Sequence, residues 1–369
     1  MLRIIFLFIL LIHALIHLLG FVKAFNIAGV NQLIQPISKM SGILWLLAAI
    51  LFVTVLSLFL LKQNYWWIVA AVAILLSQIM IFQSWSDAKF GTLANLVILI
   101  PVLVTFASAL PSSFSNMYEA EVQGRLVPID SVSILNETDI QDLPDPVQNY
   151  LRYTGAIGKP KVYDFRVVSS GEMKRKMGGN WMNIASEQHN FYSDYARLFY
   201  IESSLYGIPF NGLHKYIGNK ATMQIKVASI FQVVDAKGEE MDQSETVTFL
   251  NDMCLFAPAT LIDKNIQWEQ VDPLTVKARF VNEGIAISAT LYFNEKGELI
   301  NFTSDDRYFT ENGDEYINYK WSTPVNRYED SGGRKIATYG EAIWHTPEGE
   351  FSYAKFDLKE IEYNLQDHK

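Results

Sequence analysis

The chain has 369 residues, of which 50% are apolar and 19% charged, whereas an average soluble domain has about 25% charged residues. Residues 1–110 carry five basic side chains and one acidic one, a net charge of +4. The whole chain has a net charge of −9, so residues 111–369 have a net charge of −13. This distribution excludes a single soluble domain, an intrinsically disordered chain and a collagen-like or disulfide scaffold. The acidic second part also excludes a nucleic-acid-binding protein that acts through a broad basic face.

Four apolar stretches in the first part are long enough to cross a membrane. The hydrocarbon core of a bilayer is about 30 Å thick and needs roughly 20 apolar residues in a helix. The stretches that meet this requirement are residues 4–22, 43–61, 65–82 and 93–110. We therefore predict a transmembrane domain of four helices, with the lipid bilayer as its partner.

Few charges determine on which side of the membrane the second part lies. With four spans, both termini lie on the same side of the membrane. If the second part lies outside, the inner loops hold three lysines and the outer segments hold two basic residues, so the positive-inside rule favours neither orientation clearly. Residues 111–123 contain Glu119 and Glu121 and no basic residue, which is not typical of a cytoplasmic flank. We therefore expect an integral protein of the inner (plasma) membrane with an extracytoplasmic second part.

Polar side chains within the spans are candidates for function, because burial of a polar group in lipid is costly. His13 and His17 share a helical face, Gln78 lies in the third span and Asn95 near the start of the fourth. In one interpretation the two histidines ligate a metal or haem, or relay a proton. In a second, the polar groups hydrogen-bond to one another and hold the helices together. A third interpretation is contact with a small molecule or lipid. Since the spans contain no further histidine, cysteine or carboxylate, we prefer the packing interpretation and predict no metal site.

A period of two dominates the second part of the chain and indicates β-strands. In the clearest example Leu274, Val276, Ala278 and Phe280 alternate with polar side chains. Strands are expected around residues 161–167, 223–227, 274–280, 285–293, 298–303, 316–321, 335–344 and 351–363. Turn signals separate them at hairpin-like intervals, which predicts a long antiparallel meander.

Two helices are expected beside this sheet. The first begins at Asp145 and Pro146, with the aspartate as side-chain cap, and ends at Gly155. The second begins with a capping box formed by Asp242 and Glu245. Its apolar stripe consists of Val247, Leu250, Met253 and Cys254.

A strongly curved sheet gives these helices a face on which to bury their apolar side chains. The expected fold is an α-helical transmembrane bundle of four helices plus an α+β soluble domain, in which an antiparallel curved sheet forms a half-barrel with a few packed helices. We expect the transmembrane domain to occupy residues 1–110, a linker residues 111–142, and the soluble domain residues 143–369.

The sequence contains no catalytic motif of the G-x-S-x-G, H-E-x-x-H, P-loop or G-x-G-x-x-G type. The most suggestive polar cluster is Asp305-Asp306-Arg307, in which Asp305 and Arg307 would share one strand face. We interpret these two residues as a solvated ion pair.

The single cysteine, Cys254, is expected to be a small buried thiol. We predict no catalytic residue and no cofactor.

Aromatic side chains are frequent in the second part, and the packing of a sheet core explains them. An alternative interpretation is a concave face lined with rings that shelters an acyl chain or another apolar ligand. On this interpretation the ligand-binding residues are Trp181, Trp268, Trp321, Trp344, Glu245 and Arg307.

Several stretches carry a resemblance to a known family. They are residues 12–21, 42–47 and 85–92 in the first part and Leu143 to Val147, Tyr150-Leu151, Gly171-Glu172-Met173, Trp181, Asp242 to Glu245, Trp268-Glu269, Gly297-Glu298-Leu299 and Asp306-Arg307 in the second. Together they resemble an uncharacterised bacterial membrane-protein family with four N-terminal transmembrane helices and a β-rich domain of unknown function. The order of the strands is also similar to the lipoprotein-carrier fold of the bacterial envelope, which implies a half-barrel that shelters acyl chains.

Three functions remain open at this point. The leading hypothesis is a non-enzymatic membrane protein whose soluble domain binds a lipid, lipoprotein or other apolar ligand at the cell envelope. The first alternative is an enzyme acting on an envelope lipid, with Glu245, Asp305 and Arg307 as its candidate residues. The second is a structural or assembly partner of another membrane protein. The ligand and the oligomeric state do not follow from the sequence.

Overall fold

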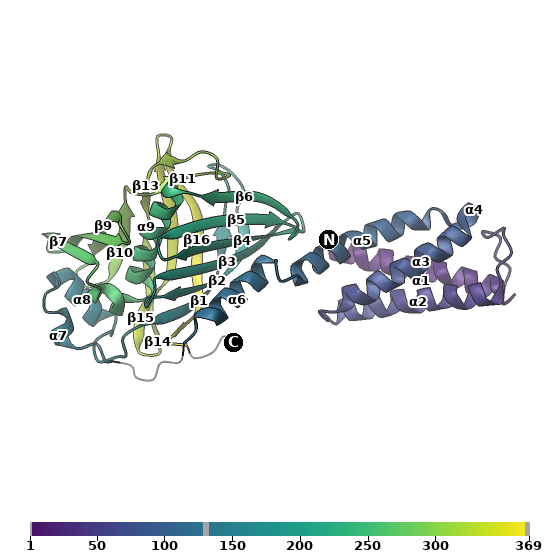
Figure 1. The fold of residues 1–369 in the computed structure, drawn as a ribbon, viewed down its shortest axis with the longest axis horizontal. Coiled ribbons are helices and arrows are strands. Elements are labelled where there is room, and N and C mark those ends of the chain that lie inside the picture. Colours follow the sequence, from purple (N-terminus) through teal and green to yellow (C-terminus); the bar gives the residue numbers. More distant parts are fainter. Residues whose placement is uncertain (1, 128–132, 366–369) are drawn as a thin grey trace. The chain divides into compact units, whose positions relative to one another are not determined.

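The computed structural model describes residues 2–127 and 133–365, and the chain divides into two compact units, Met1–Leu110 and Pro111–Lys369. Within the described residues the first unit contains helices and no strand, and the second unit contains all the strands. Figure 1 shows the first unit as a bundle of helices and the second as a broad sheet accompanied by helices.

The first unit consists of four long helices and one short helix. They are α1 (Leu2–Ala24), α2 (Lys39–Leu60), α3 (Trp66–Gln83), α4 (Trp85–Ala88) and α5 (Gly91–Ala109). The four long helices confirm the four predicted from the sequence, and by length and composition they are suited to cross a membrane. Many large apolar side chains on their outer faces are exposed, which lipid accommodates and water does not.

The helices of the first unit pack closely because small residues lie where they meet. A Cβ atom at Gly20 of α1 would lie 2.4 Å from Cγ of Trp45 on α2, so only glycine permits this approach. Phe52, Ala70 and Ile98 are fully buried in the apolar centre of the unit. Small residues at helix contacts are a common feature of membrane bundles, in which van der Waals packing drives association.

The second unit is built on an antiparallel sheet. Its strands are β1 (Asp164–Met173), β2 (Met182–Phe191), β3 (Ala196–Leu205), β4 (Ile208–Ile217), β5 (Lys220–Val227), β6 (Phe231–Lys237), β7 (Ile266–Asp272), β8 (Thr275–Asn282), β9 (Ile285–Phe293), β10 (Leu299–Ser304), β13 (Lys320–Ser322), β14 (Val325–Ser331), β15 (Arg334–Thr346) and β16 (Gly349–Tyr363). Their order is β6-β5-β4-β3-β2-β1-β16-β15-β13-β10-β9-β8-β7, and β14 pairs with β15. A separate pair is formed by β11 (Tyr308–Phe309) and β12 (Ile317–Asn318).

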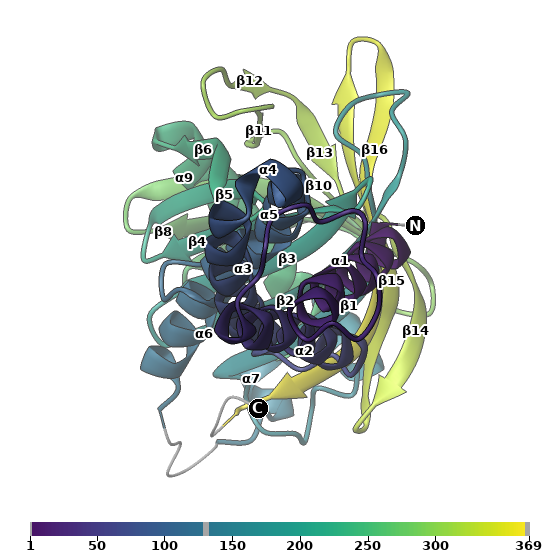
Figure 2. The ribbon, with the colours of Figure 1, turned by 90° about the vertical axis from the view of Figure 1, so that its right-hand side faces the viewer.

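The sheet curves around a central helix, α9 (Glu239–Leu255). This helix contacts β4, β5 and β6 near one end of the strand order and β9 and β10 near the other, which requires the sheet to bend back on itself. Figure 2 shows β4–β6 on one side of β1–β3 and β14–β16 on the other. The predicted antiparallel half-barrel is therefore confirmed.

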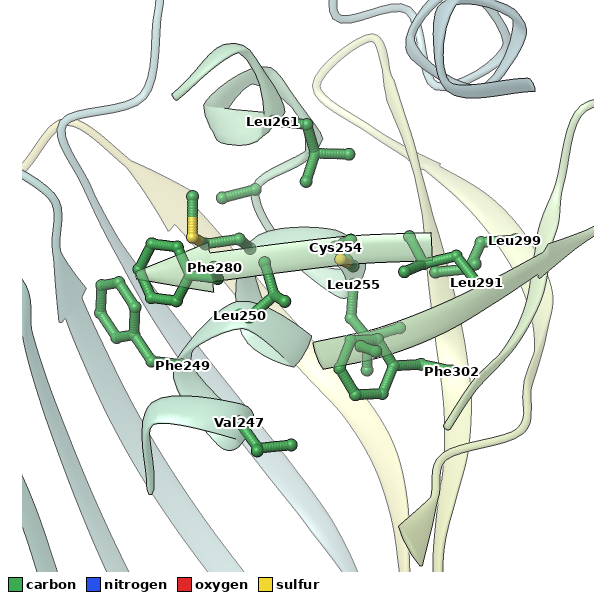
Figure 3. Packing of buried hydrophobic residues seen from close by; sticks show 14 of the residues in the cluster. Val247, Phe249, Leu250, Cys254, Leu255, Leu261, Phe280, Leu291, Leu299 and Phe302 are labelled. Atoms are coloured by element: carbon green, nitrogen blue, oxygen red, sulfur yellow. The ribbon is translucent and has the colours of Figure 1, made fainter. Parts of the chain in front are cut away.

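Helix α9 is buried on nearly all sides, unlike the amphipathic helix that the sequence analysis predicted. Fourteen of its seventeen residues are buried, polar ones included. Figure 3 shows Val247, Leu250 and Cys254 of α9 among side chains of the surrounding strands and of the short helix η1 (Pro258–Ile262). A helix enclosed by a curved sheet has no solvent face, so its polar residues must find partners inside the protein.

The predicted capping box at the start of α9 is wrong. The helix begins four residues earlier, at Glu239, with Gly238 rather than Asp242 as N-cap. The carboxylate of Asp242 instead accepts the backbone N–H of Ala221 at 2.7 Å and pairs with Lys220 Nζ at 2.8 Å. It thereby fastens the first turns of α9 to β5.

The segment 111–142, treated as a linker in the sequence analysis, contains helix α6 (Phe114–Arg125) and the short α7 (Glu137–Ile140). Phe114, Tyr118 and Val122 recur every fourth residue and form one apolar face of α6. They pack against Leu198 and Leu213 of β3 and β4, on the convex side of the sheet. The polar composition of the segment conceals this face, because these three side chains are enough to dock a short helix.

Helix α8 (Asp145–Tyr153) confirms the helix predicted there, and it ends where glycine permits. Gly155 has φ +66°, and a Cβ atom at this position would lie 2.9 Å from the carbonyl oxygen of Gly333. The predicted side-chain cap at Asp145 is wrong: Pro144 is the N-cap, and no side chain caps this end. Tyr150 of α8 donates a hydrogen bond to the carbonyl oxygen of Cys254 at 2.7 Å and so ties α8 to α9.

Candidate functional site

A cavity of about 330 Å³ lies in the second unit, on the concave side of the sheet. Inward-facing residues of β1–β5, β15 and β16 form most of its wall, and one face of α9 together with the segment around β11 completes it. The volume falls at the lower end of the range for small-molecule sites, about 300–1,000 Å³. Much of the wall is apolar, including Phe199, Ile201, Phe210, Ile225, Trp344 and Phe356.

Strand alternation creates this wall. On β3 the side chains of Arg197, Phe199 and Ile201 face the cavity, whereas Leu198 packs under α6 on the opposite face. The same period of two places Gly212 and His214 of β4 in the cavity wall. Strand β3 therefore contributes side chains both to the cavity wall and to the contact with α6.

Two arginines and two acidic residues form a charged cluster at the cavity wall. Nη1 of Arg197 lies 3.1 Å from Oε2 of Glu245, and its Nε lies 2.7 Å from Oδ2 of Asp252. Nη2 of Arg307 lies 3.5 Å from Oε1 of Glu245. The side chains of Arg197, Glu245 and Asp252 are 8%, 1% and 6% exposed, so the cluster depends on mutual pairing rather than on water.

Neutral amides complete the environment of Asp252. Its Oδ2 accepts hydrogen bonds from Gln188 Nε2 at 2.7 Å and from Asn190 Nδ2 at 3.2 Å. Oε1 of Gln188 in turn accepts from Arg197 Nη2 at 3.2 Å. The formal charges of the two arginines, Glu245 and Asp252 cancel, and burial raises the pKa of Asp252 although Arg197 opposes this shift.

The electrostatics of the cavity favour fixed protonation states at neutral pH. Burial lowers the pKa of His214 to about 4, which keeps its imidazole neutral. Burial alone would raise the pKa of Glu245, but the charges of Arg197 and Arg307 outweigh it and lower that pKa. Glu245 is therefore an ionised acceptor held by two arginines.

Arg307 lies within a group of aromatic rings. Its guanidinium carbon is 4.1 Å from the ring centroid of Trp321 and 5.2 Å from that of Trp344, within the range of cation–π attraction. Nη1 donates a hydrogen bond to Tyr353 Oη at 3.1 Å. Its Nε is buried and has no hydrogen-bond partner among the described residues, which is unusual for a buried donor.

The structure brings together four of the six side chains predicted to bind a ligand. Glu245, Arg307, Trp321 and Trp344 all line the cavity. Trp181 lies in the loop between β1 and β2, with the ammonium groups of Lys174 and Lys355 4.5 and 4.8 Å from its ring centroid. Trp268 lies on the edge strand β7, and neither it nor Trp181 contributes to the described cavity wall.

The prediction of a solvated ion pair between Asp305 and Arg307 is wrong. Arg307 follows the end of β10, and its side chain turns inward to Glu245 and is 11% exposed. Asp305 stays exposed, while Asp306 accepts the backbone N–H of Ser288 at 2.6 Å. The strand ends before these residues, so alternation no longer decides where they point.

Arg197, Asp252 and His214 were missed by the sequence analysis. They come from β3, α9 and β4, and no local spacing links them. The one available signal was a charged residue, Arg197, on the same strand face as Phe199 and Ile201. A charge on an apolar face predicts a buried partner, although it does not say which residue supplies it.

The predicted polar residues of the first unit form a second cluster, of neutral groups. His13 Nε2 and Asn95 Oδ1 are 2.9 Å apart, and His17 Nε2 is 2.9 Å from Ser77 Oγ. Asn95 Nδ2 donates to Ser77 Oγ at 3.0 Å and to Gln78 Oε1 at 3.1 Å. These contacts join α1, α3 and α5; Ser77 was not singled out from the sequence.

No group of three or more potential protein ligands is placed to hold a metal ion within the described residues. Cys254 is buried and burial raises the pKa of its thiol, so it is a poor nucleophile. The cavity therefore offers apolar surface, aromatic rings and paired charges as its means of recognition.

Residues 133–356 match a protein family described as a family of unknown function, DUF6544, and the chain belongs to this family. A comparison with curated proteins found no match. Among solved structures, the chain is similar to a LolA superfamily protein from Nitrosomonas europaea, with 9% identity and a TM-score of 0.33 over 59% of this chain and 93% of that chain. It is also similar to a DUF1329 family protein from Desulfovibrio piger, with 11% identity and a TM-score of 0.30 over 60% of this chain and 93% of that chain.

Proposed function

We propose that the second unit binds an amphiphilic ligand, such as a lipid or the acyl chain of a lipoprotein, in the cavity of the half-barrel. The observation that carries this proposal is the cavity itself. A well-packed domain leaves few voids larger than a water molecule, whereas the cavity of this domain has a volume of about 330 Å³. A protein anchored by four apolar helices has such ligands within reach at the cell envelope.

The chemistry of the wall favours a ligand with an apolar body and a hydrogen-bond acceptor. Phe199, Ile225 and Trp344 supply surface for the apolar body. The buried Nε of Arg307 has no partner among the described residues, and an acceptor on the ligand would satisfy it. The other charges of the cluster are already paired, so a free counter-ion is not required.

A cavity-filling substitution tests the proposal. Ile225 is half-buried and lines the cavity, and Ile225→Trp places a large ring in that space. Val233 on the neighbouring strand β6 is exposed, so Val233→Trp adds the same ring outside. Native mass spectrometry of the full chain released from detergent should show a bound amphiphile in the wild type and in Val233→Trp, and its loss in Ile225→Trp.

A second measurement covers the case in which the natural ligand is removed during purification. A dansyl-labelled fatty acid added to the full chain in nanodiscs should accept excitation energy from Trp321 and Trp344, which line the cavity. Ile225→Trp should abolish the saturable part of this signal. Equal binding by both tryptophan variants would refute the proposal.

An enzyme acting on an envelope lipid is the second candidate function, because Glu245, Asp252 and two arginines converge at the cavity. Both oxygens of Glu245 are engaged by arginines, and its lowered pKa makes it a poor proton donor. Incubation of the full chain with envelope lipids should therefore leave them unchanged by mass spectrometry. A product that forms with the wild type and not with Glu245→Gln would favour the enzyme.

A further inference from the structure

One end of the half-barrel collects exposed apolar side chains. In an antiparallel run of strands the connections alternate between two ends of the sheet, so the β1–β2, β3–β4 and β5–β6 connections lie at the same end. We call the residues of these connections, together with the strand ends beside them, the rim: residues 174–179, 205–208 and 228–231. Its exposed apolar side chains are Met177 (42% exposed), Leu205 (46%), Tyr206 (85%), Ile208 (53%), Ile230 (44%) and Phe231 (66%).

The rim also carries a basic group in an otherwise acidic unit. Lys174, Arg175 and Lys176 follow one another in the β1–β2 connection, whereas residues 111–369 carry a net charge of −13. Two acidic residues, Glu348 and Glu350, lie at the β15–β16 turn of the same sheet end, and Glu350 is 3.5 Å from His345. Apolar side chains beside consecutive bases are the composition of surfaces that bind anionic lipid.

The chain reaches the second unit at the rim end. Lys226 on β5 donates a hydrogen bond to the carbonyl oxygen of Ser112 at 3.1 Å, and its ammonium group lies 4.4 Å from the ring centroid of Phe114. At the opposite end of α6, Arg125 pairs with Asp194 in the β2–β3 turn. Helix α6 therefore begins at the rim end and runs away from it.

A short segment joins the rim end to the last long helix of the first unit. Helix α5 ends at Ala109, three residues before Ser112, and three residues span at most about 11 Å. Because Lys226 holds Ser112 at the rim end, the connection from α5 enters the second unit at the rim and not at the end of the sheet that carries the β2–β3 and β4–β5 turns.

We infer that the rim is a lipid-contacting surface, which docks on the bilayer in which the protein's own helices are anchored. Tyr206 and Phe231 enter the interface, and Arg175 and Lys176 lie against anionic headgroups. Arg175 also belongs to the wall of the cavity, so docking brings the cavity wall next to lipid. The inference goes beyond ligand binding and holds or fails independently of whether the cavity is occupied.

Site-specific fluorescence tests the docked state in the full chain in nanodiscs of phosphatidylcholine and phosphatidylglycerol. Cys254 is fully buried, so a nitrobenzoxadiazole label reacts with an introduced cysteine. Tyr206→Cys and Phe231→Cys report on the rim, and Ser193→Cys in the exposed β2–β3 turn is the matched control. Labels at 206 and 231 should emit further to the blue and be quenched by nitroxide-bearing lipids, while the label at 193 should show neither effect.

Substitution of the basic rim residues gives a second measurement of docking, in which the apolar rim side chains stay unchanged. Arg175 and Lys176 are exposed, so Arg175→Gln and Lys176→Gln are compatible with folding. On anionic nanodiscs the ratio of docked to undocked protein should fall about fivefold for each base removed, and on pure phosphatidylcholine it should not change. Equal lipid quenching at 193 and 206 would overturn the inference. So would rim labels shielded from water but not quenched by lipid, because that result indicates a protein partner or a second copy.

Discussion

Each unit of this protein buries a polar cluster in apolar surroundings, and the two clusters are built from different groups. In the first unit neutral side chains around His13, Ser77 and Asn95 bond directly to one another across three helices. In the second unit Arg197, Glu245 and their neighbours carry full charges and lie at the wall of a cavity. Neutral groups can be buried in a tightly packed helix bundle at modest cost, whereas buried charges need partners on several sides.

The difference indicates different roles. A neutral network that spans α1, α3 and α5 specifies how helices pack. A charged cluster beside an open space costs more to maintain than apolar packing of the same volume, which is the expected signature of a binding site rather than of a stabilising core. Three substitutions test this contrast, each with a smaller expected effect than the one before.

Removal of Arg197 should be the most destabilising. Arg197→Met leaves Asp252 and one oxygen of Glu245 buried without their cation, and breaking a buried pair in this way costs roughly 3–5 kcal/mol. The measurement is thermal unfolding of the full chain in detergent, followed by the fluorescence of the cavity tryptophans. The double variant Arg197→Met/Asp252→Asn should recover much of the loss, because Glu245 then keeps Arg307 as its partner. No recovery would mean that packing of the arginine stem, not charge, is what matters.

Acid should weaken the second unit through His214. Its pKa of about 4 in the folded state lies below the ordinary 6.5, so between these values the unfolded chain binds more protons than the folded one. The neutral, buried imidazole therefore makes its full contribution to the free energy of unfolding above about pH 6.5. As the pH falls toward 4, the free energy of unfolding decreases by about 2–3 kcal/mol. In His214→Gln this part of the pH dependence should disappear, while the loss due to carboxylates at lower pH remains. Identical unfolding curves for the two proteins from pH 7 to 4 would show that the imidazole is hydrated.

Disruption of the neutral cluster should have the smallest effect. Asn95→Leu removes one hydrogen-bond partner each of His13, Ser77 and Gln78, and hydrogen bonds between membrane helices contribute about 0.6–2 kcal/mol. Unfolding of the full chain by sodium dodecyl sulfate, followed by circular dichroism, measures the change, with Leu96→Ala on the exposed face of α5 as control. A loss larger than that of Arg197→Met would reverse the proposed division of roles.

Local sequence patterns predicted the four long helices of the first unit, α8, α9 and the strands β1, β5, β8, β9, β10, β15 and β16, but no strand at β2, β3, β4, β6, β7 or β14. The apolar runs predicted the four long helices, because lipid demands about 20 apolar residues in each. The alternation of Leu274, Val276, Ala278 and Phe280 predicted β8, since one face of that strand is buried. For α9 the pattern predicted the helix and its buried apolar stripe, but not that the sheet also encloses the polar faces. The same reasoning failed for α6, which docks through three side chains only.

The candidate site divides in the same way. Glu245, Arg307, Trp321 and Trp344 were recognisable as residues of unusual chemistry in a strand-rich domain, and the structure places all four at the cavity. The second partner of Glu245, Arg197, was not recognisable, since it lies 48 positions away in the chain. The composition and periodicity of the chain by themselves determined four apolar helices suited to cross a membrane and a curved antiparallel sheet. Which charges meet, and that a cavity remains beside them, was decided only when the sheet closed around α9, because ion pairs and voids depend on distances between residues far apart in sequence.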